Sequence, residues 1–210
     1  MRGTFISFEG IEGSGKSTQG KLLHDFLENK GADVLLTEEP GGTLIGTQIR
    51  TILLAVEHRG MSPLAELLLY NASRAQHVQE IIMPALTRGA IVITDRFTDS
   101  TFAYQGYGRG LDLQMIDSLD LIATGRLRPD ITLLLDLDVR TGLQRNRGIQ
   151  KTDRLELEAI SFHERVRNGY HKIAADNPAR IKLIQTTAGI DETHKRIIGL
   201  ISEAFGISWP

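Results

Sequence analysis

The stretch Gly10-Ile11-Glu12-Gly13-Ser14-Gly15-Lys16-Ser17 fits the pattern Gly-x4-Gly-Lys-Ser/Thr of a phosphate-binding loop. It lies between an apolar run rich in strand-forming residues, 4–8, and a segment with apolar residues at helical spacing. Glycines let backbone N–H groups surround a phosphate, and the N-terminus of the following helix favours negative charge. The order strand, loop, helix therefore predicts a nucleotide site over residues 10–18, Thr18 included. Lys16 is expected at the terminal phosphates and the Ser17 hydroxyl on Mg²⁺.

The composition excludes several classes of protein. The 210 residues suit a single α/β domain that spans 1–210. A net charge of −2 argues against nucleic acid or a membrane as a partner, since both usually attract a strong excess of basic residues. The absence of cysteine excludes disulfides and a thiolate nucleophile, and it suits a reducing compartment. With no signal peptide before the first strand and no long apolar run, we expect a cytoplasmic protein.

Strands and helices are predicted to alternate along the chain. The expected strands are apolar on both faces, so they predict a parallel sheet that is covered by helices on both sides. The fold class is therefore α/β, a three-layer fold of the P-loop NTPase type with a five-stranded parallel sheet and a small lid. The expected strands are 4–8, 33–37, 90–94, 131–136 and 181–184; the expected helices are 17–30, 44–56, 63 to about 86, two shorter ones within 98–125, and about 191–205 with Asp191 as its N-cap.

A second polar group, Asp95-Arg96, follows the third predicted strand. Ligands of parallel sheets bind beyond the carboxyl ends of the strands, which is where this pair stands. The Asp95 carboxylate can hold Mg²⁺ or its water, and the forked Arg96 guanidinium suits a second anion. A surface ion pair in a turn is the alternative. The chain lacks the Asn-Lys-x-Asp motif with which GTPases read their base, which argues against that class.

Several motifs together resemble those of bacterial thymidylate kinases. They are Phe8-Glu9-Gly10-x-Glu12-Gly13-x-Gly15-Lys16-Ser17-Thr18, Glu39-Pro40-Gly41-Gly42-Thr43, Tyr70-x3-Arg74-x-Gln76, Asp95-Arg96-Phe97 and Ala103-Tyr104-Gln105-Gly106, in the family's order and spacing over about residues 5–165. The second and fifth motifs are more specific than the phosphate loop. The chain departs from the family at Glu38, where an arginine is common, and at Phe97, where tyrosine or histidine is frequent.

The resemblance implies the reaction ATP + dTMP → ADP + dTDP with Mg²⁺, carried out by a homodimer. Phosphoryl transfer requires two phosphates in line and cancellation of their repulsion. By resemblance, Arg96 and Arg50 hold the acceptor phosphate, and Glu9 lies between the phosphates, where it positions the metal or the acceptor. Ser17, Asp95 and Glu9 are the expected metal residues. The other residues expected to bind dTMP are Pro40, Tyr70 stacked on thymine, Arg74, Thr101 and Gln105 at its polar edge, and Tyr104 against the 2′ position of the sugar.

A basic segment after the fourth predicted strand resembles the lid of the bacterial branch of this family. The phosphate loop carries no arginine, whereas Arg145, Arg147, Lys151 and Arg154 cluster later in the chain. Transfer builds charge on the phosphoryl group, and P-loop enzymes often stabilise it with an arginine. We expect a lid over about residues 146–155 that closes on ATP, with Arg147 and Arg154 as catalytic cations. A solvated charged loop is the alternative.

The residues alone leave three other functions open. A deoxynucleoside kinase would share the phosphate loop but need a carboxylate base for its neutral hydroxyl acceptor. Another nucleoside monophosphate kinase would lack Glu-Pro-Gly-Gly-Thr, and a regulatory module would bind nucleotide without transferring a phosphoryl group. The six histidines have no metal-ligand spacing, and Asp136-x-Asp138 is expected to cap a helix rather than hold a metal.

Overall fold

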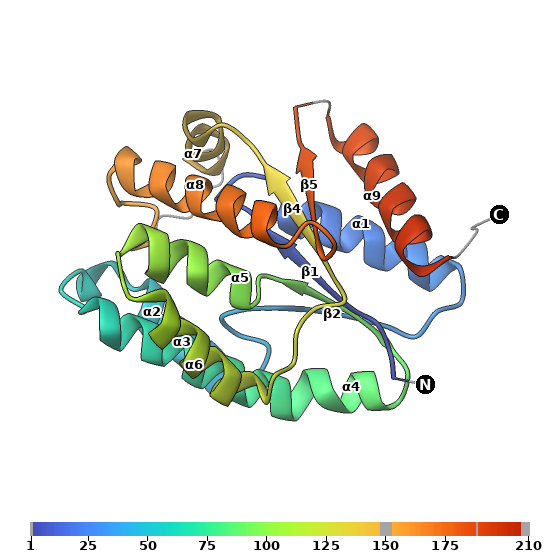
Figure 1. The fold of residues 1–210 in the computed structure, drawn as a ribbon, viewed down its shortest axis with the longest axis horizontal. Coiled ribbons are helices and arrows are strands. Elements are labelled where there is room, and N and C mark those ends of the chain that lie inside the picture. The colour runs from blue at the N-terminus through green and yellow to red at the C-terminus, as the bar shows by residue number, and fades with distance from the viewer. Residues whose placement is uncertain (1, 148–152, 188, 207–210) are drawn as a thin grey trace.

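The computed structural model describes residues 2–147, 153–187 and 189–206, and a five-stranded sheet forms their centre (Figure 1). All the strands run parallel, in the order β2-β3-β1-β4-β5. The strands are β1 Phe5–Glu9, β2 Val34–Glu38, β3 Ile91–Asp95, β4 Ile131–Asp136 and β5 Ile181–Gln185. The predicted sheet is confirmed, and each strand lies within a residue of its expected position.

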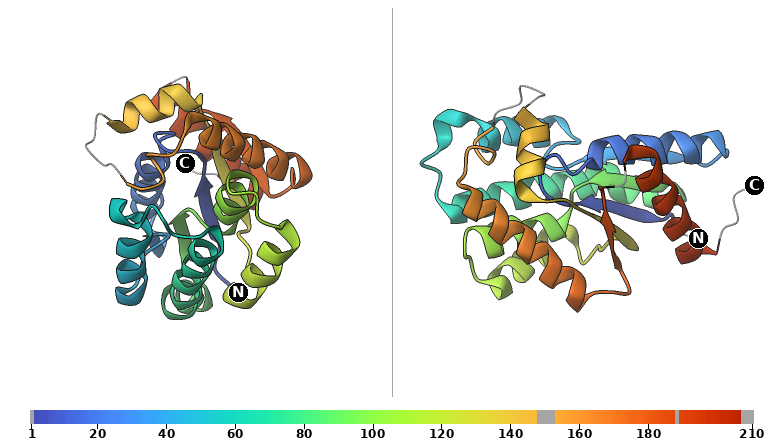
Figure 2. Two further views of the ribbon diagram at one scale, coloured as in Figure 1. Left: turned by 90° about the vertical axis from the view of Figure 1, so that its left-hand side faces the viewer. Right: turned by 90° about the horizontal axis from the view of Figure 1, so that it is seen from above.

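Helices cover both faces of this sheet, as the two turned views in Figure 2 also show. Along β1, Ile6 and Phe8 face one layer and pack with Leu23 of α1 and Ile197 of α9, whereas Phe5 belongs to the core of the opposite layer. The helices are α1 Lys16–Asn29, α2 Leu44–Leu54, α3 Pro63–His77, α4 Met83–Thr87, α5 Thr98–Thr101, α6 Leu113–Thr124, α7 Val139–Arg147, α8 Ile160–Asp176 and α9 Ile190–Phe205, with the short helical segments η1 Val56–His58, η2 Val78–Ile82 and η3 Phe102–Gly108.

Three features of the helices differ from the sequence prediction. The helix expected to run from Pro63 towards Leu86 contains the π-helical segment η2. The segment η2 ends at Ile82, and α4 continues the helix through Pro84, whose ring cannot accommodate the carbonyl one turn earlier and which has no N–H to donate. Helix α2 ends at Leu54, and Val56 begins the separate η1. The prediction of Asp191 as an N-cap is wrong, because Gly189 with φ 95° holds that position and Asp191 lies in the first turn of α9.

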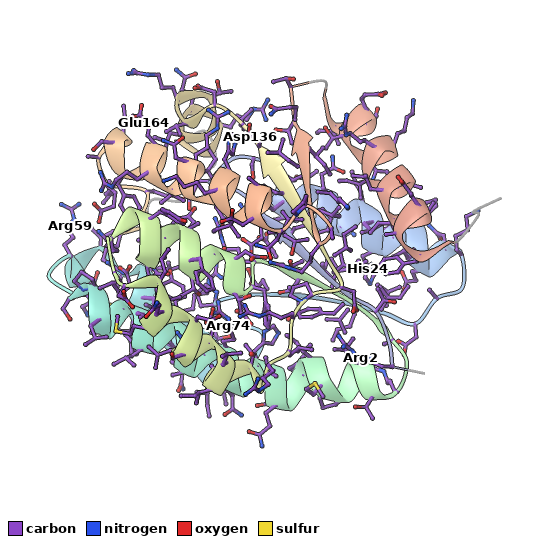
Figure 3. The ribbon with its side chains drawn as sticks, in the orientation of Figure 1. Arg2, His24, Arg59, Arg74, Asp136 and Glu164 are labelled. Carbon is purple, nitrogen blue, oxygen red and sulfur yellow. The ribbon has the colours of Figure 1, made fainter. Side chains whose placement is uncertain are left out.

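Two aspartates after β4 tie the second half of the chain together. Asp138 accepts a hydrogen bond from the Thr141 backbone N–H at 3.0 Å, so the predicted helix cap is confirmed there. Asp136, labelled in Figure 3 at the end of β4, accepts two hydrogen bonds from Arg167 of α8, at 2.7 and 2.8 Å. Gln185 of β5 donates to the same carboxylate at 2.9 Å. Asp136 therefore fixes α8 and β5 against β4. None of the helices in the described ranges is long and apolar enough to cross a membrane.

Candidate active site

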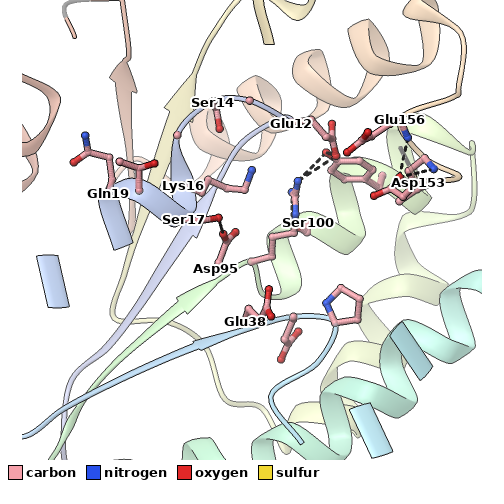
Figure 4. Close-up of a pocket in the computed structure, with 18 of the residues that line it drawn as sticks. Glu12, Ser14, Lys16, Ser17, Gln19, Glu38, Asp95, Ser100, Asp153 and Glu156 are labelled. Atoms are coloured by element: carbon pink, nitrogen blue, oxygen red, sulfur yellow. Dashed lines mark hydrogen bonds and ion pairs between the residues drawn. The ribbon is translucent and has the colours of Figure 1, made fainter. Parts of the chain in front are cut away.

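A cleft of about 680 Å³ opens at the carboxyl ends of the central strands, a size typical of small-molecule sites (Figure 4). The residues that line it come from segments far apart in the sequence, between Glu12 and Thr193. The sequence-predicted residues that line it are Glu12, Gly13, Ser14, Gly15, Lys16, Ser17, Thr18, Pro40, Arg50, Tyr70, Arg74, Asp95, Arg96, Thr101, Tyr104 and Gln105. The fold therefore brings most of the predicted nucleotide residues and acceptor residues to one place.

The phosphate loop joins β1 to α1 at one side of the cleft. Gly15 adopts the left-handed conformation with φ 98°, and a Cβ atom on Gly13 would lie 2.2 Å from the Gly142 carbonyl oxygen in α7. Both positions therefore require glycine. The Lys16 ammonium lies across the loop and donates to the Ile11 carbonyl oxygen at 2.9 Å. Burial lowers the pKa of Lys16 to about 8, and the nearby Arg96 guanidinium acts in the same direction.

Ser17 and Asp95 supply two oxygen atoms that point toward each other in Figure 4. The Ser17 hydroxyl donates to Asp95 Oδ2 at 2.5 Å. The register of the sheet causes this contact, because Asp95 pairs with Phe8 next to the phosphate loop. A hydroxyl and a carboxylate are ligands that suit the hard cation Mg²⁺. The donor set therefore fits the metal that the sequence implies.

Glu9 lies behind this cleft rather than on its wall. Its side chain is fully buried, and it accepts hydrogen bonds from the Phe97 N–H at 2.8 Å, the Ser100 hydroxyl at 2.6 Å and the Tyr170 hydroxyl at 2.8 Å. Burial, with a further contribution from the Asp99 charge, raises the pKa of Glu9 to about 7. Glu9 thus anchors the segment that follows β3, and its contact with a metal or phosphate stays a prediction.

Arg96 is held in a conformation that non-glycine residues rarely adopt, with φ 77°. Its guanidinium donates to the Gly10 carbonyl oxygen at 3.0 Å and to Glu12 Oε1 and the Tyr104 hydroxyl oxygen at 3.2 Å each. It also lies over the Tyr104 ring, 5.0 Å from the ring centroid. Strained residues cluster at functional sites because surrounding contacts must enforce them. The geometry presents a fixed cation at the point where the loop and the acceptor pocket meet.

The second expected phosphate ligand, Arg50, pairs with Glu38, one of the positions at which the chain departs from the family. Its Nη1 donates to the Pro40 carbonyl oxygen at 2.7 Å and lies 3.3 Å from Glu38 Oε2. Glu38 is largely exposed and also lines the cleft. The acidic substitution thus places a carboxylate beside Arg50 at the mouth of the site.

The predicted base pocket is built around Arg74, which is 2% exposed. Figure 3 labels Arg74 in the interior, between the lower helices and the sheet. Its guanidinium donates to Glu39 Oε2 at 2.8 Å, Asp120 Oδ1 at 2.8 Å, Thr101 Oγ1 at 2.7 Å and the Phe97 carbonyl oxygen at 3.1 Å. These bonds leave one N–H of the five that a guanidinium offers for a ligand. Arg74 is therefore rigid and aligned by its neighbours.

Arg154, predicted as a lid cation, occupies a different place. It is buried, does not line the cleft, and its Nη1 lies 2.6 Å from Glu66 Oε2. Glu66 also accepts from Gln105 at 2.9 Å, so the ion pair supports a predicted base contact. Glu66 stands one helical turn before Tyr70 on α3, a spacing that could have indicated its role. Of the remaining lid, the Arg147 side chain and residues 148–152 lie outside the described residues, and Arg145 lines the cleft.

Sequence reasoning missed one end of the cleft. Residues Gln19, Thr186, Gly189, Ile190 and Thr193 line it, in part from the segment between β5 and α9. Gln19 of α1 donates to the Ile190 carbonyl oxygen at 2.8 Å and joins this segment to the helix that follows the phosphate loop. The signal available in the sequence was the position of this segment, because it follows the carboxyl end of a predicted strand.

Comparison with known proteins identifies one family. The profile described as Thymidylate kinase matches residues 8–197. The chain is 53% identical over 198 residues to a thymidylate kinase of Geotalea daltonii, with 91% of this chain and 92% of that protein covered. It is 49% identical over 209 residues to one of Syntrophotalea carbinolica, covering 97% of each. A crystal structure of thymidylate kinase from Ehrlichia chaffeensis matches with a TM-score of 0.78 and 38% identity, over 96% of this chain and 99% of that one.

Proposed function

The chain belongs to the thymidylate kinase family, and we propose that it transfers the γ-phosphoryl group of ATP to dTMP, giving ADP and dTDP for dTTP biosynthesis. The observation that carries the assignment of residues is the pairing of two anion sites on adjacent strands. The phosphate loop follows β1, and Arg96 follows β3 at a distance of one hydrogen bond from Gly10. Such a pair can hold two phosphates next to each other.

The donor phosphates bind to the loop. Backbone N–H groups of residues 13–18 surround them, and the N-terminus of α1 contributes a partial positive charge. The Lys16 ammonium leaves the Ile11 carbonyl oxygen and moves to the phosphates, because a phosphate oxygen is the stronger acceptor. Bound Mg²⁺ would supply positive charge that offsets the charge developing on the phosphates. The Ser17 hydroxyl and the Asp95 carboxylate would hold it.

The acceptor is bound by its phosphate and by its base. Arg96 and Arg50 grip the phosphate, whose oxygen is already ionised at neutral pH and therefore needs no strong general base. Tyr70 offers an apolar ring to thymine, while Arg74, Thr101 and Gln105 meet its polar edge. Tyr104 excludes a 2′ hydroxyl from the sugar. We further propose that the protein works as a homodimer in the cytoplasm.

A coupled assay for ADP release tests this function. The purified protein is given ATP and Mg²⁺ with dTMP, with other nucleoside monophosphates, or with thymidine, and we expect rapid ADP formation with dTMP. Lys16→Ala should lower kcat by about 10²-fold or more while the fold is kept, because it removes a charge aimed at the transferred group. Lys21→Ala is the matched control, since Lys21 lies on the exposed side of the same helix and pairs with Asp25 at 2.9 Å.

Each other outcome points to a different function. Thymidine as the preferred acceptor would identify a deoxynucleoside kinase. Binding of ATP without ADP release for any acceptor would identify a regulatory module. Equal kcat in Lys16→Ala and Lys21→Ala would remove the phosphate loop from the reaction.

A further inference from the structure

Among the described residues, three buried polar atoms lack a hydrogen-bond partner at Glu12, which pairs with Arg96, and at its neighbour His163. They are Glu12 Oε2 and both ring nitrogens of His163, which is 1% exposed. Buried polar atoms are nearly always hydrogen-bonded, and those that are not call for an explanation. The mechanism above uses neither His163 nor this oxygen of Glu12.

The two side chains face each other across a gap that is too wide for a hydrogen bond. His163 belongs to α8, and its Nδ1 lies 3.6 Å from Glu12 Oε2. The other carboxylate oxygen of Glu12 is engaged, since Oε1 accepts from the Tyr104 hydroxyl at 2.6 Å and from Arg96 Nη2 at 3.2 Å. Glu12 is therefore hydrogen-bonded to Arg96 through one carboxylate oxygen, and its other oxygen lies near the His163 imidazole, at 3.6 Å, without a close hydrogen bond.

An acceptor phosphate disturbs this arrangement. Arg96 is the proposed phosphate ligand, but without a substrate its Nη2 is bonded to the Glu12 carboxylate. A phosphate and a carboxylate on the same guanidinium repel each other strongly in a site shielded from water. Protonation of Glu12 would remove this repulsion, but the carboxylate stays ionised at neutral pH. Burial acts to raise its pKa, whereas His163, Arg96 and Lys16 together hold that pKa well below its ordinary value. If the Glu12 carboxylate gives up its hydrogen bond from Arg96, it needs a hydrogen bond from another donor.

We propose that His163 is a positioning residue that takes over Glu12 when an acceptor phosphate binds to Arg96. The Glu12 carboxylate turns towards α8 and accepts a hydrogen bond from His163 Nδ1, which closes the gap of 3.6 Å. A neutral imidazole has one N–H to donate, so the exchange requires no change of protonation. It frees one arm of Arg96 for the phosphate. This inference rests on the proposed dTMP site.

Calorimetric binding of dTMP in the absence of ATP tests the exchange in four proteins: wild type, His163→Phe, Glu12→Gln and the double variant. His163→Phe removes both nitrogens and should raise the Kd for dTMP roughly tenfold to a hundredfold, the range of hydrogen bonds to charged groups. It should leave the Kd for ATP unchanged. In the Glu12→Gln background there is no anion to relocate, so His163→Phe should change the Kd for dTMP by less than about twofold.

His171→Asn is the matched control. His171 lies on the same helix, but its Nε2 bonds to Asp136 at 2.8 Å, away from the acceptor site, so the Kd for dTMP should stay at the wild-type value. A Kd for dTMP that His163→Phe leaves within about twofold of wild type, or weakens equally in both backgrounds, overturns the proposal.

Nitrogen NMR of the wild-type protein gives a readout that does not depend on the folding of His163→Phe. With ¹⁵N-labelled histidine, addition of dTMP should move the His163 Nδ1 resonance to the position of a hydrogen-bonded N–H, and Glu12→Gln should abolish this shift. An unchanged resonance in a protein saturated with dTMP overturns the proposal and leaves the proposed function intact. A wild-type protein that binds no dTMP overturns the proposed function and this exchange with it.

Discussion

Arg96 joins the two halves of the proposed site. Its φ of 77° and its bonds to Gly10, Glu12 and Tyr104 fix the guanidinium between the phosphate loop and the acceptor pocket. The sequence alone predicted its role from its position after a strand. It could not predict the strained backbone or the bond to Glu12, because both arise from contacts between segments far apart in the chain.

Arg96→Ala tests the assignment of the two phosphate positions. The KM for dTMP should rise by about a hundredfold, as expected for the loss of charge-assisted hydrogen bonds, and the affinity for ATP should stay nearly unchanged. Calorimetric titration with each nucleotide separates the two effects. Loss of ATP binding with intact dTMP binding would mean that the two pockets are assigned the wrong way round.

Among the elements, the sheet and the phosphate loop follow from local patterns, and the sequence predicted them well. Continuous apolar runs and a glycine-rich turn are encoded within a few residues. The ion pair between Glu66 and Arg154 joins positions 88 residues apart, and no local pattern encodes such a contact. The segment between β5 and α9 was missed for another reason: threonine and glycine in a loop have no periodicity that marks them as part of a site.

The structure divides the predicted lid cations into two groups. Arg145 of α7 lines the cleft, whereas Arg154 is buried against Glu66. We expect Arg145→Ala to lower kcat by at least about tenfold with little change in the KM values, because a cation that meets the phosphoryl group acts on the transition state. Arg154→Ala should instead lower the stability by about 2 kcal/mol, because Glu66 loses one of its two ion pairs and keeps the other, with Arg109 at 3.1 Å.

Steady-state kinetics and thermal unfolding of each variant distinguish these roles. Arg140→Ala is the control for α7, since Arg140 is exposed on the same helix and does not line the cleft. A large fall in kcat for Arg154→Ala with an unchanged melting temperature would restore it as a lid cation. The same loss of kcat in Arg140→Ala and Arg145→Ala would show a general effect of helix charge. The role of Arg147 stays a prediction.

For the whole molecule, the predicted homodimer has a candidate surface on α2 and α3. Large apolar side chains are exposed there: Leu44 at 77%, Ile45 at 49%, and Leu64 and Leu68 at 47% each. Leu64 and Leu68 are one helical turn apart and therefore lie on the same side of α3. Apolar side chains gathered on one surface are typical of a contact with another protein. The same helix carries Tyr70 and Arg74, so its packing also bears on the acceptor pocket.

Leu68→Lys tests whether this surface joins two copies of the chain. The wild-type protein should sediment as a dimer, and the variant should shift towards the monomer, because burying a lysine without a partner opposes association. Lys195→Glu, an exposed charge reversal on α9 across the sheet, should leave the dimer intact. If dimerisation supports the acceptor pocket through α3, the KM for dTMP should rise in Leu68→Lys with the monomer fraction, and higher protein concentration should restore it. A monomeric wild type, or a dimer that Leu68→Lys does not weaken, would exclude this surface as the interface.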